Sequence, residues 1–154
     1  MTTPFLYGTV GSVYNLLTTE LNSLASGSGT AFGPVIDNST NNYQIGRLEL
    51  VIASNSLTFT STSLVRVYAL PRLSDGTNYP NYTSGASYKL ATANYLIGII
   101  KVIPAAISAA VVRETLDGVR IPQGRFKTVL VSELGVTLPS SGNTLDLLPT
   151  PDAY

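Results

Sequence analysis

The chain has 154 residues, of which 44% are hydrophobic and 12% are charged, and nine basic side chains balance nine acidic ones. The length is typical of one domain, whereas soluble domains usually carry about 25% charged residues. The absence of cysteine and histidine excludes disulfides, thiolate and imidazole metal ligands, and triads that need a histidine base. With no net charge and no basic run, the composition also argues against a nucleic-acid or membrane-surface partner.

The low fraction of charged residues and the zero net charge favour assembly of this chain with other chains. A free monomer usually stays soluble through net charge and scattered ionic groups. We therefore expect neighbouring chains to cover much of the surface, as in a homo-oligomer. The alternative is a monomer kept soluble by its many Ser, Thr and Asn side chains.

Residues 1–30 are predicted to form an N-terminal α-helix and a Gly/Ser linker. Leucines at helical spacing predict the helix over residues 12–26, with Ser12 as its N-cap and Gly27 after its end. We expect its apolar stripe to pack on the sheet or on a neighbouring subunit; the stripe consists of Val13, Leu16, Leu17, Leu21 and Leu24. The Ser-Gly-Ser-Gly-Thr stretch that follows is typical of a flexible linker.

Residues 31–154 are predicted to form an antiparallel β-sandwich. In residues 47–52 and 64–70, apolar residues alternate with others at period two, the pattern of a half-buried strand. Many short strands separated by turn residues, without intervening helices, favour a two-sheet sandwich with jelly-roll topology. The predicted strands are residues 32–36, 43–53, 56–60, 63–70, 87–90, 95–103, 107–114, 126–133 and 144–148.

Neither a secretory signal nor a spanning helix is predicted. The first residues lack a basic start followed by an unbroken apolar run. The longest apolar stretch, residues 95–112, is interrupted by Lys101 and Pro104, whereas a spanning helix needs about 20 predominantly apolar residues. We expect two core strands joined by a turn in this stretch.

Two loop motifs have competing interpretations. Asp75, Asn78 and Asn81 offer oxygen atoms at regular spacing, but calcium prefers several carboxylates, so a plain Asp-Gly turn is favoured over a metal site. Asn38 and Asn81 each begin an Asn-X-Ser/Thr glycosylation pattern, which a chain so rich in these residues produces by chance.

No catalytic site is predicted, because no two acidic residues have a spacing that forces an acid/base pair together. The densest basic group is expected to form an ion-pair cluster neutralised by Glu114 and Asp117. This group consists of Arg120, Arg125 and Lys127.

Tyrosines are the aromatic residues of most interest, since there are nine of them against four phenylalanines and no tryptophan. Tyrosine combines apolar area with a hydroxyl and is enriched in protein interfaces. Tyr79, Tyr82 and Tyr88 stand in or beside one loop, so we expect a contact patch there. The alternative is that they line the rim of the core.

Five segments carry a resemblance to known proteins: residues 66–71 (RVYALP), 75–79 (DGTNY), 121–127 (IPQGRFK), 134–138 (LGVTL) and 140–145 (SSGNTL). They resemble small structural proteins of tailed-phage virions, the head-decoration (cement) and minor capsid proteins with a jelly-roll-like domain. The likeness extends over residues 43–149 and is a pattern of strands and turns.

The resemblance implies a non-enzymatic protein without cofactors, made in the host cytoplasm and bound to the outer surface of the head. Its implied partners are the major capsid protein and other virion proteins, and its implied state is a homo-oligomer, commonly a trimer. The alternatives are a tail or baseplate adaptor, and a carbohydrate- or receptor-binding module, which aromatic residues aligned on one exposed sheet face would favour.

Overall fold

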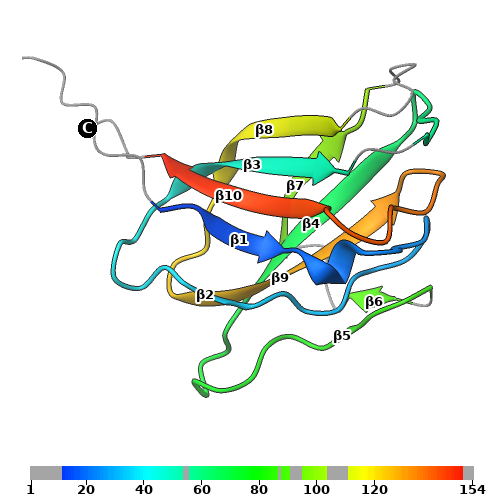
Figure 1. Cartoon of the computed structure of the whole chain (residues 1–154). Helices are drawn as coiled ribbons and strands as arrows, with labels where there is room; N and C mark the ends of the chain where they lie inside the picture. Colours follow the sequence, from blue (N-terminus) through cyan, green and yellow to red (C-terminus); the bar gives the residue numbers. More distant parts are fainter. Residues whose placement is uncertain (1–11, 54–55, 87, 91–94, 104–110, 151–154) are drawn as a thin grey trace, which may run out of the picture.

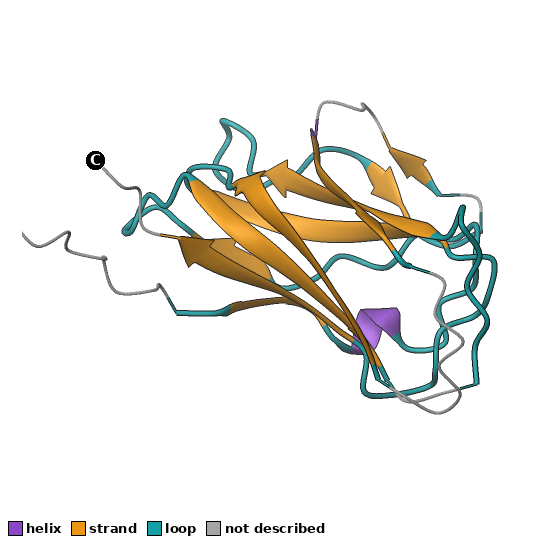
Figure 2. Cartoon of the chain, turned by 90° about the horizontal axis from the view of Figure 1, so that it is seen from above, coloured by secondary structure: helices purple, strands orange, loops and turns teal. Residues whose placement is uncertain are grey.

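The structure is a computed structural model that describes residues 12–53, 56–86, 88–90, 95–103 and 111–150. The described residues are almost all strand, turn and loop (Figure 1), which confirms the all-β prediction. Two antiparallel sheets of four strands face each other as a sandwich, and a two-stranded sheet lies beside them. Figure 2 shows the strands in layers, with one short helical turn next to them.

Sheet A has the strand order β1-β10-β3-β8 and sheet B the order β2-β9-β4-β7. The strands of sheet A are β1 (Tyr14–Leu17), β3 (Ile45–Ile52), β8 (Val112–Arg120) and β10 (Thr144–Thr150). The strands of sheet B are β2 (Val35–Asp37), β4 (Leu64–Pro71), β7 (Leu96–Lys101) and β9 (Arg125–Glu133). The small sheet pairs β5 (Tyr82–Thr83) with β6 (Lys89–Leu90), and the helical turn is the 3-10 helix η1 (Thr19–Leu21).

The core fills the space between the two sheets. Leu48, Leu50 and Ile52 of β3 point inward and are at most 1% exposed. Val65, Val67 and Ala69 of β4 point inward from the facing sheet and are at most 2% exposed, and all six residues belong to one hydrophobic cluster. The alternation predicted for these two strands is therefore confirmed, because side chains two apart on a strand share a face.

The predicted helix over residues 12–26 is wrong. Tyr14–Leu17 is β1, whose residues pair with β10, and only Thr19–Leu21 form a short 3-10 turn. Ser23 has a φ of 55°, which a right-handed helix cannot contain. The Ser, Thr and Asn residues of this segment also favour turns and caps over helix interiors, so pairing with β10 determines the local structure.

The Gly/Ser stretch expected as a linker is hydrogen-bonded to β9. The amide of Gly27 donates to the carbonyl of Ser132 at 2.7 Å, and the amide of Ser132 donates to the carbonyl of Ser28 at 2.9 Å. The amide of Thr30 donates to the carbonyl of Leu130 at 2.9 Å. Residues 27–30 therefore extend the edge of sheet B along β9.

Two predicted strands differ from the observed elements. Residues 56–60 form no strand, since the amide of Ser63 closes a turn on the carbonyl of Thr60 at 3.0 Å. The strand predicted at 107–114 begins in residues outside the described part, and β8 continues to Arg120. Asp117 and Gly118 together face Arg47, so an Asp-Gly pair that reads as a turn is a bulge inside the strand.

Within the part of the chain that the structure describes, no helix is long and apolar enough to cross a membrane.

Candidate functional site

The leucines predicted as interface residues lie in the core of their own chain. Leu16, Leu17 and Leu21 are 0% exposed, and Leu24 is 8% exposed. Val13 differs, since it is 51% exposed. Of the two packings expected for these leucines, the structure has the one within the chain, because β1, η1 and the turns around them place the side chains in the core cluster.

The three predicted tyrosines come together beside Gly29 and Phe32. The Tyr82 hydroxyl donates to the carbonyl of Thr30 at 2.8 Å, and its ring lies 5.4 Å from that of Phe32. The Phe32 ring also lies 6.4 Å from Tyr79, and a Cβ placed on Gly29 would lie 3.0 Å from the Cβ of Tyr88. Burial raises the pKa of Tyr82 to about 12. These contacts are within the chain, so a role toward a partner stays a prediction.

The cluster of Phe32, Tyr79, Tyr82 and Tyr88 lies on the outward side of sheet B. Leu70, Val129 and Val131 alternate with the inward residues of β4 and β9, yet each is 0% exposed and none belongs to the core cluster between the sheets. Gly85, between β5 and β6, pairs with Gly29 through two backbone hydrogen bonds of 2.9 and 3.1 Å. We conclude that the segment carrying β5 and β6 covers this part of sheet B.

The predicted neutralisation of the basic group by Glu114 and Asp117 is wrong. Arg125 pairs with Asp37 at 2.6 Å, and Asp117 pairs with Arg47. Glu114 instead accepts a backbone hydrogen bond from Ile103 at 3.2 Å. The hydroxyl of Ser39 and the guanidinium of Arg125 hold the pKa of Asp37 well below its usual range.

Lys127 and Arg120, the other two members of that group, make no ion pair among the described residues. The Lys127 ammonium lies 4.8 Å from the ring centre of Tyr79 and 5.2 Å from that of Phe32, so a cation–π contact takes the place of a carboxylate. Arg120 is exposed at the end of β8 and has no aromatic or acidic contact of this kind in the described chain. Among the arginines on the strands, Arg120 is therefore the one to examine for a ligand.

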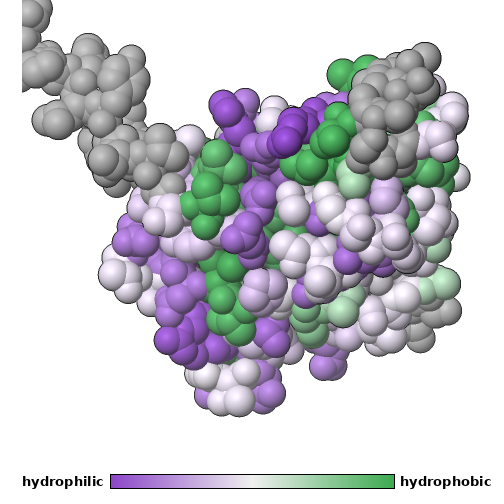
Figure 3. Space-filling model, viewed as in Figure 1, coloured by the Kyte–Doolittle hydropathy of each residue, from purple (hydrophilic) through white to green (hydrophobic). Residues whose placement is uncertain are grey.

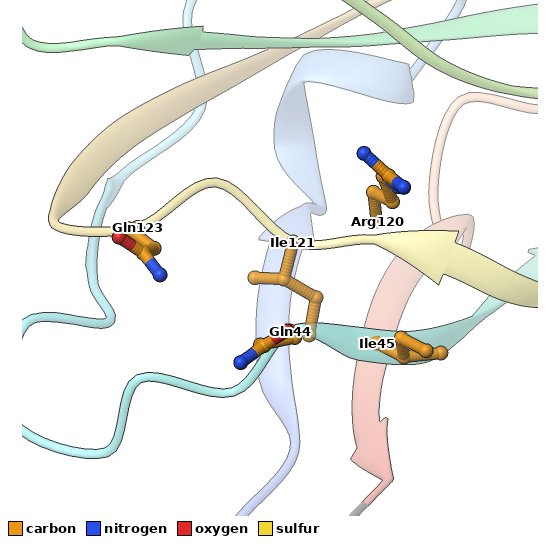
Figure 4. A pocket seen from close by; sticks show the side chains of 5 residues that line it. All are labelled: Gln44, Ile45, Arg120, Ile121 and Gln123. Carbon is orange, nitrogen blue, oxygen red and sulfur yellow. The ribbon is translucent and has the colours of Figure 1, made fainter. Parts of the chain in front are cut away.

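Arg120 lines two shallow pockets, one on each side of the turn between β8 and β9. The polar pocket has a volume of about 270 Å³ and is lined by Gln44, Ile45, Arg120, Ile121 and Gln123 (Figure 4). The apolar pocket has a volume of about 370 Å³ and is lined by Ala69, Pro71, Tyr95, Leu96, Ile97, Arg120, Ile121 and Pro122. Arg120 and Ile121 belong to both linings.

A buried asparagine holds this turn against the loop before β3. Asn38 is 0% exposed, and its side-chain amide donates to the carbonyls of Tyr43 at 2.8 Å and Pro122 at 3.1 Å. Its side-chain carbonyl accepts from the amide of Tyr43 at 3.0 Å. The amide of Ile121 donates to the carbonyl of Gln44 at 2.8 Å. Both walls of the polar pocket are thus connected by backbone and buried side-chain bonds.

The chemistry of the pocket linings is that of binding. Guanidinium and side-chain amide groups donate hydrogen bonds to carboxylates and hydroxyls. Among the described residues, neither lining contains a carboxylate, lysine or serine.

The sequence identified Arg120 only as one member of a basic group. It did not point to Gln44 and Gln123, which are ordinary polar residues in loops, or to the structural role of Asn38. The one signal available was the run of turn residues around each.

The loop of the conceivable calcium site uses its carboxylate internally. Asp75 accepts hydrogen bonds from the amides of Thr77 and Asn78, both at 2.9 Å, and from the side chain of Asn78 at 2.7 Å. These bonds lower the pKa of Asp75. Among the described residues, no group of three or more acidic side chains is placed to hold a metal ion.

Comparison with known families, curated proteins and solved structures gives no significant match to this chain.

Proposed function

We propose that this chain is a structural protein of a tailed-phage virion, a capsid decoration protein with a jelly-roll domain that stabilises the head shell through protein–protein contacts. Its partners would be the major capsid protein and other virion proteins on the outer surface of the head. The strand order of the sandwich carries the proposal.

The chain changes sheets at nearly every step. It passes from β1 in sheet A to β2 in sheet B, returns to β3, and crosses again to β4. From β7 in sheet B it then alternates through β8 and β9 to β10. A double sheet of eight strands built from two Greek keys is the jelly roll, which is common in viral coat and lectin domains.

The composition and surface agree with a protein that works by contact. Only 12% of residues are charged, and large apolar side chains stand exposed at several places on the sandwich. Those exposed by more than 40% are Val13, Val35, Ile45, Leu73, Ile99, Ile103 and Val111. Figure 3 shows apolar stripes between hydrophilic residues on the side of sheet A. On a symmetric shell each weak contact is repeated, so a trimer binds through avidity where one contact would not suffice.

The test has two parts. The mass of the purified chain in solution is compared with that of one chain, and the protein is then sedimented with empty heads and with isolated tails of the phage that encodes it. We expect an oligomer that sediments with heads. Binding to tails alone would favour the tail or baseplate adaptor, and a monomer that binds neither would overturn the proposal.

One observation favours a second candidate, a carbohydrate- or receptor-binding module. The pockets beside Arg120 combine amide donors with a tyrosine ring, and lectin domains share the jelly-roll architecture. Binding to immobilised glycans without binding to heads or tails would establish this candidate instead.

A further inference from the structure

We propose that Arg120 and its two pockets receive a segment of a neighbouring protein chain that presents a carboxylate beside an aliphatic side chain. This inference rests on the proposed function and names the contact chemistry of one part of its surface. The carboxylate would bind in the polar pocket and the aliphatic side chain in the apolar one.

The guanidinium of Arg120 carries a charge that no described acidic side chain neutralises. The other arginines on the sheets already have acidic partners: Arg47 with Asp117, Arg66 with Glu133, Arg113 with Glu49 and Arg125 with Asp37. Arg120 stands on β8, a strand of the same sheet as Arg47 and Arg113, and has no such partner among the described residues. An arginine presents a planar fork of donors that matches a carboxylate in a two-point contact.

The neighbours of Arg120 in the polar pocket add donors without adding a competing charge. Gln44 and Gln123 carry side-chain amides, each with two N–H groups, and the remaining lining residues are isoleucines. In Figure 4, Gln44 lies close to Ile121. Arg120 lies on one side of Ile121 along the chain, and Gln123 lies on the other side. None of the described residues that line the pocket is acidic, so an incoming carboxylate would meet donors and apolar surface there.

The apolar pocket gives the second half of the contact. Its lining is aliphatic apart from Tyr95 and Arg120 itself, and Leu96 at its rim is 37% exposed. An aliphatic side chain placed there would remove Leu96 and its neighbours from water, which is favourable in proportion to the area buried.

The turn between the pockets is held in place before any partner arrives. The bonds from Asn38 to Pro122 and from Ile121 to Gln44 connect the turn to the loop before β3. A preorganised site loses less conformational freedom on binding, so a small contact is worth more.

A protein partner fits these linings better than a sugar. Saccharides usually stack a face of the ring on an aromatic side chain, as small-molecule sites rich in aromatic residues do. Among the described residues, no aromatic side chain lines the polar pocket, and Tyr95 lines only the apolar pocket.

The direct test is a nuclear magnetic resonance titration of the full chain. The probes are acetyl-Leu-Glu-amide, its neutral analogue acetyl-Leu-Gln-amide, and glucuronic acid. We expect the acidic dipeptide to shift the Arg120 Nε–H signal and the side-chain amide signals of Gln44 and Gln123, saturably and reduced by salt. The neutral analogue should bind about tenfold or more weakly, the effect of losing a charge-assisted hydrogen bond.

The matched variants are Arg120→Gln and Lys101→Gln. Both remove one positive charge from an exposed strand position, and Lys101 lies outside both pockets. Equal unfolding midpoints for the two variants and the unmodified chain would show that each is folded. We expect Arg120→Gln alone to abolish the dipeptide shifts and to weaken binding to heads about tenfold or more.

The two proposals fail differently. If the unmodified chain binds heads and Arg120→Gln binds them equally well, the inference is overturned and the proposed function stands. If the unmodified chain binds neither heads nor tails, the proposed function fails, and the titration still decides whether Arg120 receives a peptide carboxylate. Shifts caused by glucuronic acid and not by the dipeptide would replace the protein partner with an acidic sugar.

Discussion

The outward faces of the two sheets meet different surroundings. On sheet A many outward positions carry polar and charged side chains, several of which pair with each other. Asn15 bonds to Asp146 at 2.8 Å, and Arg113 pairs with Glu49 at 3.2 Å with 65% of its side chain exposed. On sheet B the outward Val129 and Val131 are 0% exposed.

The difference arises because sheet B is covered by its own chain. The Gly29–Gly85 pair and the bond from Tyr82 to Thr30 attach the segment with β5 and β6 to the edge of sheet B. Strand alternation therefore determines on which side of a sheet a residue lies, but it does not determine what the residue meets there. Three changes test this comparison.

The largest effect is expected from matched valine-to-threonine substitutions. Val131→Thr places a hydroxyl under the cover of sheet B and should lower the free energy of unfolding by about 1–3 kcal/mol. Val51→Thr makes the same change at a half-buried outward position of sheet A and should stay within about 0.5 kcal/mol. Urea unfolding midpoints measure both. Equal costs at the two positions would mean that the cover of sheet B is open in solution.

A smaller effect is expected from Tyr82→Phe. Loss of the hydrogen bond to Thr30 should cost about 0.5–1.5 kcal/mol. Tyr79→Phe is the control, since its hydroxyl makes no hydrogen bond among the described residues, and it should change stability by less than about 0.5 kcal/mol. A Tyr82→Phe variant as stable as the control would contradict the role of this bond in holding the cover.

The same tyrosine predicts a pH dependence. The pKa of Tyr82 is raised from 10.0 to about 12 in the folded chain, so folding favours its protonated form. Its contribution is complete below pH 10, and it is lost as the pH rises from 10 to about 12. The unmodified chain should lose more stability over this window than Tyr82→Phe, as thermal unfolding at each pH would measure.

The smallest effect is expected for the coupling energies of the ion pairs on the outward faces of the two sheets. Arg66 and Glu133 on sheet B make a two-point contact at 2.9 and 3.2 Å, with each side chain 37% exposed. A double-mutant cycle with glutamine should give a coupling of up to about 1 kcal/mol for this pair, against about 0.2–0.5 kcal/mol for Arg113 and Glu49. Both should fall in 1 M salt, where charges are screened within ~3 Å. A stronger coupling on sheet A would reverse the comparison.

The predictions from sequence succeeded where a local period is decisive. Alternation in β3 and β4 identified the inward residues, and the leucines of residues 12–26 were correctly recognised as apolar side chains that need burial. Their helical spacing was misleading, since Leu16 and Leu17 are both buried at a register shift between β1 and β10.

The candidate site was less predictable than the fold. Arg120 was noticed, but the partners assigned to its group were neighbours in sequence, whereas Arg125 pairs with Asp37 across two strands. Gln44 and Gln123 are 79 positions apart in the chain and line the same pocket, where the amide of Ile121 donates to the carbonyl of Gln44. The order of residues in the sequence does not indicate which distant residues lie close together in the fold.

The sequence by itself determined that most of this chain is β-structure and that it contains no cysteine or histidine, because strand period and composition are local properties. Only the tertiary structure decided which leucines are core, which face of the sandwich is covered, and that Arg120 alone among the arginines of the sheets has no acidic partner among the described residues. Those outcomes depend on which distant segments pair, and pairing energy is set by the neighbours that folding brings together.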